Sequence, residues 1–206
     1  MAPRAGVLSL QGDAEPHRET LGRLGVRALP VRRPADLAGL SHLVLPGGES
    51  TTLHHLMELV GLWEPIAAAW RAGRLALFGT CAGAILLGHA TSVGEPPPRW
   101  GLLDAELERN AYGRQLDSSA RELAVLGRPF RALLIRAPRI TAVGPDAHVL
   151  ARDGDDPVLV EGPGLLAATF HPELAGDPAV HGYFLNRVRP AGAAACKPAS
   201  RRPEPA

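Results

Sequence analysis

The residues with the clearest capacity for chemistry surround Cys81. An apolar run at 75–78 leads into Gly-Thr-Cys-Ala-Gly at 79–83, and a second apolar run follows. This order is typical of a nucleophile elbow, in which a strand delivers one reactive side chain to a sharp turn and a helix leaves directly behind it. Glycines on either side remove side chains where the two backbones approach each other. We therefore predict that Cys81 is a nucleophile, with a buried structural cysteine as the alternative.

A cysteine nucleophile needs a base to hold its proton, and the base needs a carboxylate that orients it. His171 and Glu173 come directly after the apolar run 165–169. In an extended segment two such residues point to the same side, and Pro172 disfavours helical geometry for His171. The spacing thus predicts His171 as the base and Glu173 as its orienter. The alternative is an ordinary His-Pro-Glu loop.

Two polar segments are candidates for binding. In Pro-Gly-Gly-Glu-Ser at 46–50, Gly47 and Gly48 can turn backbone N–H groups toward a developing oxyanion, whereas Ser50 could equally serve as a helix N-cap. The cluster at 108–115 and Arg136 are suited to a carboxylate or a partner surface, or are simply solvated. The spacing of Cys and His matches no zinc site, so we expect no metal.

The elements that must position these residues alternate in the first ninety residues. Strand-like runs at 6–10, 26–31, 42–45 and 75–78 are separated by helix-like segments at 17–24, 51–60 and 63–72. This predicts an α/β fold whose open, mostly parallel sheet is flanked by helices. Loops at one edge of such a sheet converge on a single pocket.

The second half of the sequence has a different pattern of predicted elements. Short β-like pieces at 102–108, 130–135, 139–143, 148–151, 158–161 and 165–169 predict mixed or antiparallel pairing within the same domain, closed by a helix at 178–188. The Ala-, Pro- and Arg-rich stretch 190–206 lacks periodicity and is expected to be a disordered tail. We therefore expect one domain over 1–189.

Composition narrows the function class. The chain has 206 residues, 46% of them hydrophobic and 21% charged, with a net charge of +1. These values predict a soluble globular protein and give no electrostatic case for nucleic acid or membrane partners. No signal peptide is evident, and two cysteines in different contexts, Cys81 and Cys196, argue against a disulfide. We expect a cytoplasmic protein.

Taken together, these motifs resemble the class I (triad) glutamine amidotransferases. Within them, the chain is similar to the family of glutaminase subunits of pyridoxal 5′-phosphate synthase. The matching stretches are 8–13, 45–52, 109–115, 135–138 and 168–174, in unbroken order between residues 5 and 188. The Cys elbow and His-x-Glu are shared by the whole superfamily, whereas Gln-Gly-Asp, Gly-Gly-Glu-Ser-Thr-Thr and Arg-Asn-Ala-Tyr-Gly-Arg-Gln are specific to this family.

The resemblance implies a flavodoxin-like fold and hydrolysis of L-glutamine to glutamate and ammonia through a thioester on Cys81, with His171 and Glu173 completing the triad. It implies no cofactor. Its partner would be a (β/α)8-barrel synthase subunit that makes pyridoxal 5′-phosphate (vitamin B6), with about twelve copies of each subunit in a closed ring. The implied glutamine and oxyanion contacts are Gly47, Gly48, Glu49, Ser50, Ala82, Arg109, Ile135 and Arg136.

Two other functions fit parts of the sequence. A non-catalytic glutamine-sensing module could keep the fold, although the intact Cys-His-Glu set argues against it. Another cysteine hydrolase, such as a peptidase or esterase, would share the elbow but does not predict the 46–50 and 109–115 segments. The chain departs from the family at Ala84, in the Pro-rich loop 95–99 and in the tail that contains Cys196.

Overall fold

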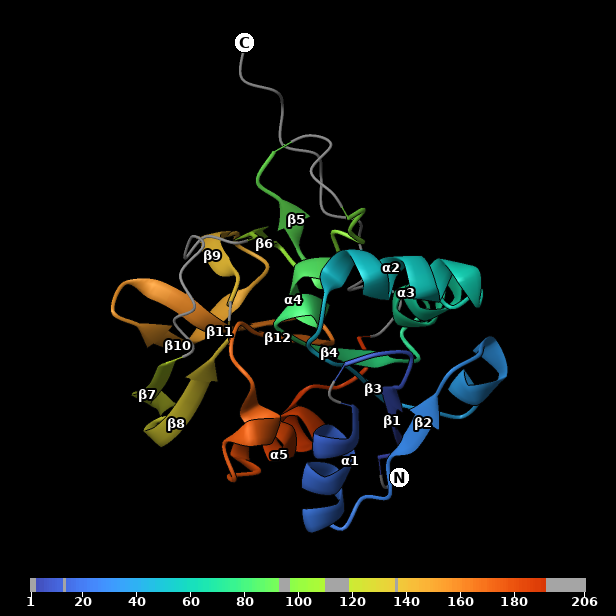
Figure 1. Cartoon of the computed structure of the whole chain (residues 1–206), viewed down its shortest axis with the longest axis horizontal. Coiled ribbons are helices and arrows are strands. Elements are labelled where there is room, and N and C mark those ends of the chain that lie inside the picture. Colours follow the sequence, from blue (N-terminus) through green and yellow to red (C-terminus); the bar gives the residue numbers. More distant parts are fainter. Residues whose placement is uncertain (1–2, 13, 93–96, 110–118, 136, 192–206) are drawn as a thin grey trace.

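A seven-stranded sheet forms the centre of the protein (Figure 1). The computed structural model describes residues 3–12, 14–92, 97–109, 119–135 and 137–191. The strand order is β10-β11-β12-β4-β3-β1-β2. Parallel pairs join β1 (Ala5–Leu8), β2 (Leu29–Val31), β3 (His42–Leu45), β4 (Ala76–Thr80) and β12 (Leu165–Ala168). Antiparallel pairs add β11 (Asp156–Gly162) and β10 (His148–Asp153) at one edge. The predicted mostly parallel α/β sheet is confirmed.

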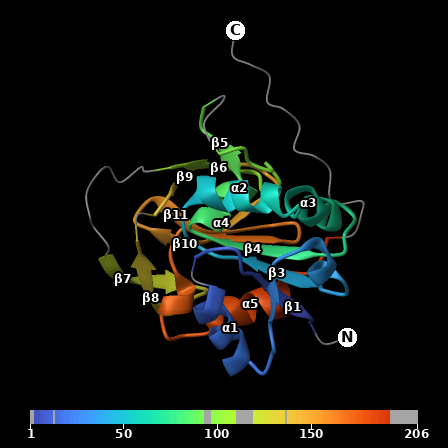
Figure 2. The same cartoon turned by 45° about the vertical axis from the view of Figure 1, so that its right-hand side comes forward.

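Helices cover both faces of this sheet (Figures 1 and 2). One face carries α1 (Ala14–Arg23) and α5 (Ala179–Arg187), and the other carries α2 (Ser50–Leu59), α3 (Trp63–Arg71) and α4 (Ala82–Leu87). Because side chains of a strand alternate between faces, Leu43 and Leu45 of β3 join the α2–α3 core, whereas Val44 joins the α1–α5 core. Apolar strands buried on both sides are what a parallel sheet requires.

Smaller β elements lie beyond the β10 edge and above the sheet (Figure 1). A three-stranded sheet joins β5 (His89–Ala90), β6 (Ala105–Glu108) and β9 (Arg139–Val143), and β7 (Ser119–Val125) pairs with β8 (Arg128–Leu134) as a hairpin. Two 3-10 turns, η1 (Pro34–Leu37) and η2 (Pro172–Leu174), complete the described elements. In the part of the chain that the structure describes, no helix is long and apolar enough to cross a membrane.

The helices and most of the strands lie where the sequence predicts them, with boundaries displaced by a few residues. The strands at 42–45 and 139–143 match their predicted bounds. Strand β7 was missed, because its side chains are largely exposed and therefore show no apolar alternation. Residues 110–115 of the polar cluster, Arg136, part of the loop 95–99 and residues 192–206 with Cys196 lie outside the described residues.

Candidate active site

Cys81 occupies the turn between β4 and α4 in a strained backbone conformation. Its φ of 47° and ψ of −102° are rarely adopted by residues other than glycine. Its backbone N–H donates to the Ala168 carbonyl of the neighbouring strand at 2.9 Å, and its own carbonyl accepts from Ile85 in α4 at 3.2 Å. The turn is thus anchored on both sides, and the side chain is 7% exposed. This is the geometry of a nucleophile elbow.

Glycines make this turn possible because the backbones around it touch. A Cβ atom at Gly79 would lie 2.5 Å from the carbonyl carbon of Gly83. A Cβ atom at Gly83 would lie 2.1 Å from the carbonyl oxygen of Leu45 on β3. Side chains at either position would therefore push α4 away from the strands that carry it.

His171 reaches Cys81 because both follow neighbouring parallel strands. Thr80 at the end of β4 pairs with Ala168 at the end of β12, so Cys81 comes one residue and His171 three residues beyond the same point of the sheet. The backbone N–H of His171 donates to the Leu133 carbonyl at 2.9 Å, and its φ of −102° and ψ of 86° are not helical. The convergence of loops at this sheet edge is as the sequence predicts.

Glu173 lies against the imidazole of His171. Nδ1 of His171 is 2.7 Å from Oε1 of Glu173, and both side chains are buried. The prediction of an extended His-x-Glu segment was wrong in detail, because Glu173 lies within η2. The 3-10 turn that starts at Pro172 brings the carboxylate back to the ring, and the pairing results from this turn.

Opposing effects act on the pKa of His171. Burial by itself lowers the pKa of His171, but hydrogen bonds to Cys81 and Glu173, with the negative charges of both, raise this pKa to about 10. The imidazole is therefore charged at neutral pH when it lies between a carboxylate and a thiolate.

The Gly47–Gly48 turn also packs against the imidazole of His171. A Cβ atom at Gly47 would lie 2.5 Å from Cε1 of His171. Gly48 has a φ of 131°, which a residue with a side chain rarely adopts. The backbone of Gly12 fills the space behind the turn, where an added Cβ would meet the Gly47 carbonyl oxygen at 2.1 Å. The loops after β1, β3 and β12 therefore converge at His171.

Glu49, rather than Ser50 or Thr51, caps helix α2. Its carboxylate accepts from the backbone N–H groups of Thr51 at 3.1 Å and Thr52 at 2.7 Å. Burial raises the pKa of Glu49 somewhat, but these hydrogen bonds dominate and hold it below its ordinary value. The cap interpretation for Ser50 was wrong, because Ser50 is already the first helical residue and is buried. Arg109 donates to Glu49 Oε1 at 3.1 Å and so lies at the same loop.

Two more predicted residues lie beside the cysteine. The carbonyl of Ile135 is 3.9 Å from Cys81 Sγ, so this residue faces the thiol through its backbone. Ala82 follows Cys81 as the first residue of α4, where N–H groups lack intrahelical acceptors. Gln11, in the loop after β1, donates to the Glu49 carbonyl at 2.7 Å.

Sequence reasoning missed the residues behind Glu173. His17 of α1, Thr80 of β4 and His181 of α5 are all fully buried. His17 Nε2 lies 3.4 Å from Glu173 Oε2 and 3.2 Å from Thr80 Oγ1, and His17 Nδ1 lies 2.8 Å from His181 Nε2. The available signal was weak: a histidine inside each of two predicted helices, in positions that an apolar face would otherwise occupy.

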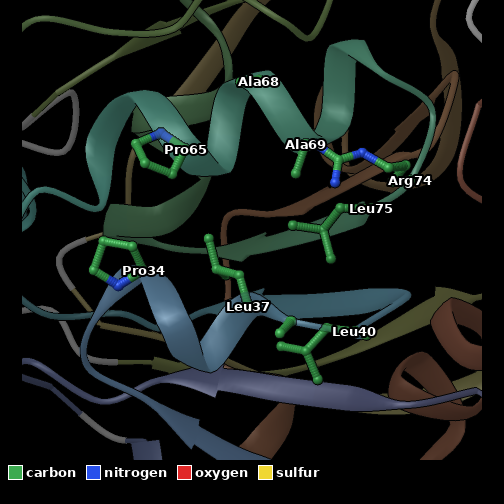
Figure 3. A pocket seen from close by; sticks show the side chains of 10 residues that line it. Pro34, Leu37, Leu40, Pro65, Ala68, Ala69, Arg74 and Leu75 are labelled. Carbon is green, nitrogen blue, oxygen red and sulfur yellow. The ribbon is translucent and has the colours of Figure 1, made fainter.

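The pocket in Figure 3 lies elsewhere. It is about 540 Å³ in volume and lies between η1 and α3, with lining residues that include Leu37, Leu40, Pro65, Arg74 and Leu75. Leu75 precedes β4, whereas Cys81 follows it. The pocket therefore lies toward the opposite end of β4, away from Cys81.

The fold and this geometry define the class: an α/β protein with a cysteine elbow beside a histidine–carboxylate pair. The chain belongs to the SNO glutamine amidotransferase family, which it matches over residues 7–190. It is 51% identical over 181 residues to "Pyridoxal 5'-phosphate synthase subunit PdxT" from Thermus thermophilus, covering 87% of this chain and 95% of that one. The protein of the same name from Deinococcus radiodurans is 50% identical over 186 residues, covering 87% and 94%.

Comparison with solved structures also points to the glutamine amidotransferase fold. A crystal structure described as that of a glutamine amidotransferase superimposes with a TM-score of 0.83 at 48% identity, covering 88% of this chain and 96% of that chain. The structure of PurLQS from Thermotoga maritima has a TM-score of 0.62 at 20% identity, covering 90% and 94%. The second likeness shows the shared fold alone.

Proposed function

We propose that this protein is the glutaminase subunit of a pyridoxal 5′-phosphate synthase. It hydrolyses L-glutamine to glutamate and ammonia with Cys81, His171 and Glu173 as catalytic triad, and supplies the ammonia for vitamin B6 biosynthesis. The observation that carries the proposal is the strained Cys81 elbow beside the 2.7 Å His171–Glu173 pair, in a chain of this family. The relatives in Thermus and Deinococcus carry the synthase subunit name.

The chemistry follows from the charges of the triad. The Cys81 thiolate attacks the carboxamide carbon of glutamine, and a C–S bond forms as the carbonyl becomes an oxyanion. When the oxyanion collapses, the C–N bond breaks and the His171 imidazolium gives its proton to the leaving ammonia. Neutral His171 then takes a proton from water, which attacks the glutamyl thioester. Glutamate leaves, and the thiolate and imidazolium are restored. Glu173 holds His171 Nδ1–H throughout.

The remaining predicted residues surround this reaction. The backbone N–H groups of Gly48 and Ala82 are the proposed oxyanion donors, on either side of the cysteine. Gly47, Glu49 and Ser50 shape the loop against His171, and Arg109, Ile135 and Arg136 are the proposed contacts of glutamine. The packing of Gly47 on His171 and the 3.9 Å approach of Ile135 to Sγ support this assignment for the described members.

The ammonia requires an acceptor, so the proposal includes a partner. We propose that the partner is a (β/α)8-barrel synthase subunit, with about twelve copies of each chain in a closed ring. The names of the relatives support a synthase assembly, and the barrel and the stoichiometry rest on family resemblance.

The decisive assay measures glutamate release from glutamine, with and without the synthase subunit. Cys81→Ala and His171→Ala should lower kcat by about 10⁶-fold and Glu173→Gln by only about 10⁴-fold, because the third member orients the base. Cys196→Ala, which removes the other cysteine, is the control and should retain activity. Full activity of Cys81→Ala, or no glutamate release even with the partner, would refute the proposal.

The alternative, a glutamine-sensing module without turnover, makes the opposite prediction for the same assay. It expects tight glutamine binding and no glutamate under any partner condition. The strained Cys81 turn beside the His171–Glu173 pair favours the enzyme, because glutamine binding alone does not require a cysteine next to a histidine–carboxylate pair.

We further propose that residues 1–189 form a single amidotransferase domain, that residues 190–206 lie outside it, and that the protein acts in the cytoplasm. Two apolar cores on opposite faces of one sheet support a single unit. The family match, which ends at residue 190, supports the boundary.

A further inference from the structure

The carboxylate of Glu173 has two oxygens, and only one of them serves His171. Oε1 accepts from His171 Nδ1 at 2.7 Å. Oε2 is buried, has no close hydrogen-bond partner among the described residues, and has His17 Nε2 at 3.4 Å. A buried carboxylate oxygen without a donor is costly, so the identity of the group facing it is informative.

The hydrogen-bonding partners determine which nitrogen of His17 carries the proton. An ionised carboxylate only accepts, so the Nε2 atom that faces Glu173 and Thr80 must be the protonated one. Nδ1 of His17 is then a bare acceptor, and His181 Nε2–H donates to it across 2.8 Å. The opposite assignment would place a lone pair against the carboxylate and would leave a buried N–H at His181 Nδ1, which has no described partner.

The environment keeps both histidines neutral, which this arrangement requires. Burial, followed by the neighbouring His181 and His171, lowers the pKa of His17 well below its ordinary value. Burial and the positive charge of Arg23 lower the pKa of His181 to about 3. The groups that face the triad carboxylate from the elements packed around it are therefore His171 from the β12 loop, neutral His17 from α1 and, behind it, neutral His181 from α5.

From this geometry we infer that His17 is a positioning residue of the triad, which donates its Nε2–H toward Glu173 Oε2 while His181 fixes its tautomer. The inference rests on the proposed triad. The donor holds the carboxylate turned toward His171. A series of neighbouring side chains then leads from the thiol into the core, in the order Cys81, His171, Glu173, His17 and His181. This series connects the elbow to both helices on the α1–α5 face.

The consequence concerns the proton on His171. Without the His17 donor, the Glu173 carboxylate is free to rotate away from His171 Nδ1. It then stabilises the imidazolium less, and the pKa of His171 falls. Because the chemistry needs the imidazolium as an acid, the alkaline limb of the activity profile moves to lower pH.

The first experiment needs no variant. Long-range ¹H–¹⁵N correlation spectra of the full chain, labelled at histidine, report the tautomer of each ring. We expect His17 and His181 to be neutral with the proton on Nε2 from pH 6 to pH 9, and His171 to be doubly protonated. An Nδ1–H tautomer or a charged ring at His17 would overturn the inference, whether or not the protein hydrolyses glutamine.

The second experiment compares variants of His17. The pKa of His171, measured by the same spectra, should fall by about one unit or more in His17→Leu, which has no donor. It should stay near the wild-type value in His17→Gln, whose amide nitrogen replaces Nε2–H. In the complex with the synthase subunit, kcat should fall between about ten- and a hundred-fold in His17→Leu, with little change in KM.

A matched control separates positioning from folding. His42 is also buried, packs its ring on Phe184 and makes two hydrogen bonds, at 2.9 Å with Ser41 Oγ and at 3.0 Å with the Val188 carbonyl, but it lies at the opposite end of the sheet. His42→Leu should cost similar stability and leave the pKa of His171 unchanged. An unchanged His171 pKa in His17→Leu, or an equal fall in both variants, would overturn the inference. Loss of activity in Cys81→Ala is a separate result that tests the triad alone.

Discussion

At the scale of single residues, the site stores strain and charge in places where a stable core would have neither. Cys81 adopts a φ of 47°, and His171 and Glu173 are a charged pair in the interior. The strained turn costs stability, and burying either charge without its partner would cost stability too. They persist because neighbours hold them in place: hydrogen bonds to Ala168 and Ile85 anchor the elbow, and Glu173 Oε1 lies 2.7 Å from His171 Nδ1. Such costs are expected where function rather than stability selects the residue.

The pH dependence of stability follows from the raised pKa of His171. The folded protein holds this proton up to about pH 10, against an ordinary value of 6.5. The stabilisation is therefore complete below about pH 6.5 and is lost as the pH rises to about 10. Glu173→Gln removes the negative charge of Glu173, which is one of the causes of the raised pKa of His171. The wild-type advantage over Glu173→Gln in free energy of unfolding, measured by urea denaturation, should shrink between pH 6.5 and pH 10. An advantage that grows with pH would contradict the assignment.

At the scale of elements, α4 and β3 approach each other so closely that no side chain should fit at Gly83 between them. Gly83→Ala would place Cβ 2.1 Å from a backbone oxygen of β3, so the helix must move, and we expect a loss of about 1–3 kcal/mol in free energy of unfolding, with loss of glutaminase activity. Gly22→Ala is the matched control.

Gly22 lies in the exposed last turn of α1, where an added Cβ meets nothing within 4 Å. Alanine there should stabilise the protein by about 0.5–1 kcal/mol. Equilibrium denaturation of both variants provides the comparison. Equal effects of the two substitutions would show that the contact at Gly83 does not constrain the elbow.

How far the sequence predicts these elements depends on how local their causes are. The parallel sheet is predictable because strands such as 42–45 are apolar on both faces, and Cys81 because its elbow is a continuous motif. The exposed hairpin strand 119–125 lacks apolar alternation, and the Glu173 contact arises from a 3-10 turn that the extended pattern did not indicate. His17 and His181 are 164 residues apart and meet only in the folded protein, so no local pattern reveals them.

At the scale of the whole molecule, one sheet joins two apolar cores. Leu45 and Leu77 face α2 and α3, while Val44 and Phe78 of the same strands face α5 and α1. The proposed triad combines both layers, because the elbow starts α4 on one face and the histidines behind Glu173 come from the other. If the two cores unfolded separately, unfolding of the less stable core alone would already disrupt the site. A shared sheet instead predicts a single cooperative unit.

The tryptophans make this cooperativity measurable. Trp70 belongs to the α2–α3 core and Trp63 and Trp100 pack against it, so fluorescence reports that face, whereas far-ultraviolet circular dichroism reports all helices and strands. We expect the two urea transitions to coincide. Phe184→Leu, a substitution in the opposite core, should lower the midpoint of both by the same amount, equivalent to about 1–2 kcal/mol. A tryptophan transition that stays in place while the dichroism transition moves would show that the two faces unfold independently, and would refute a single domain over 1–189.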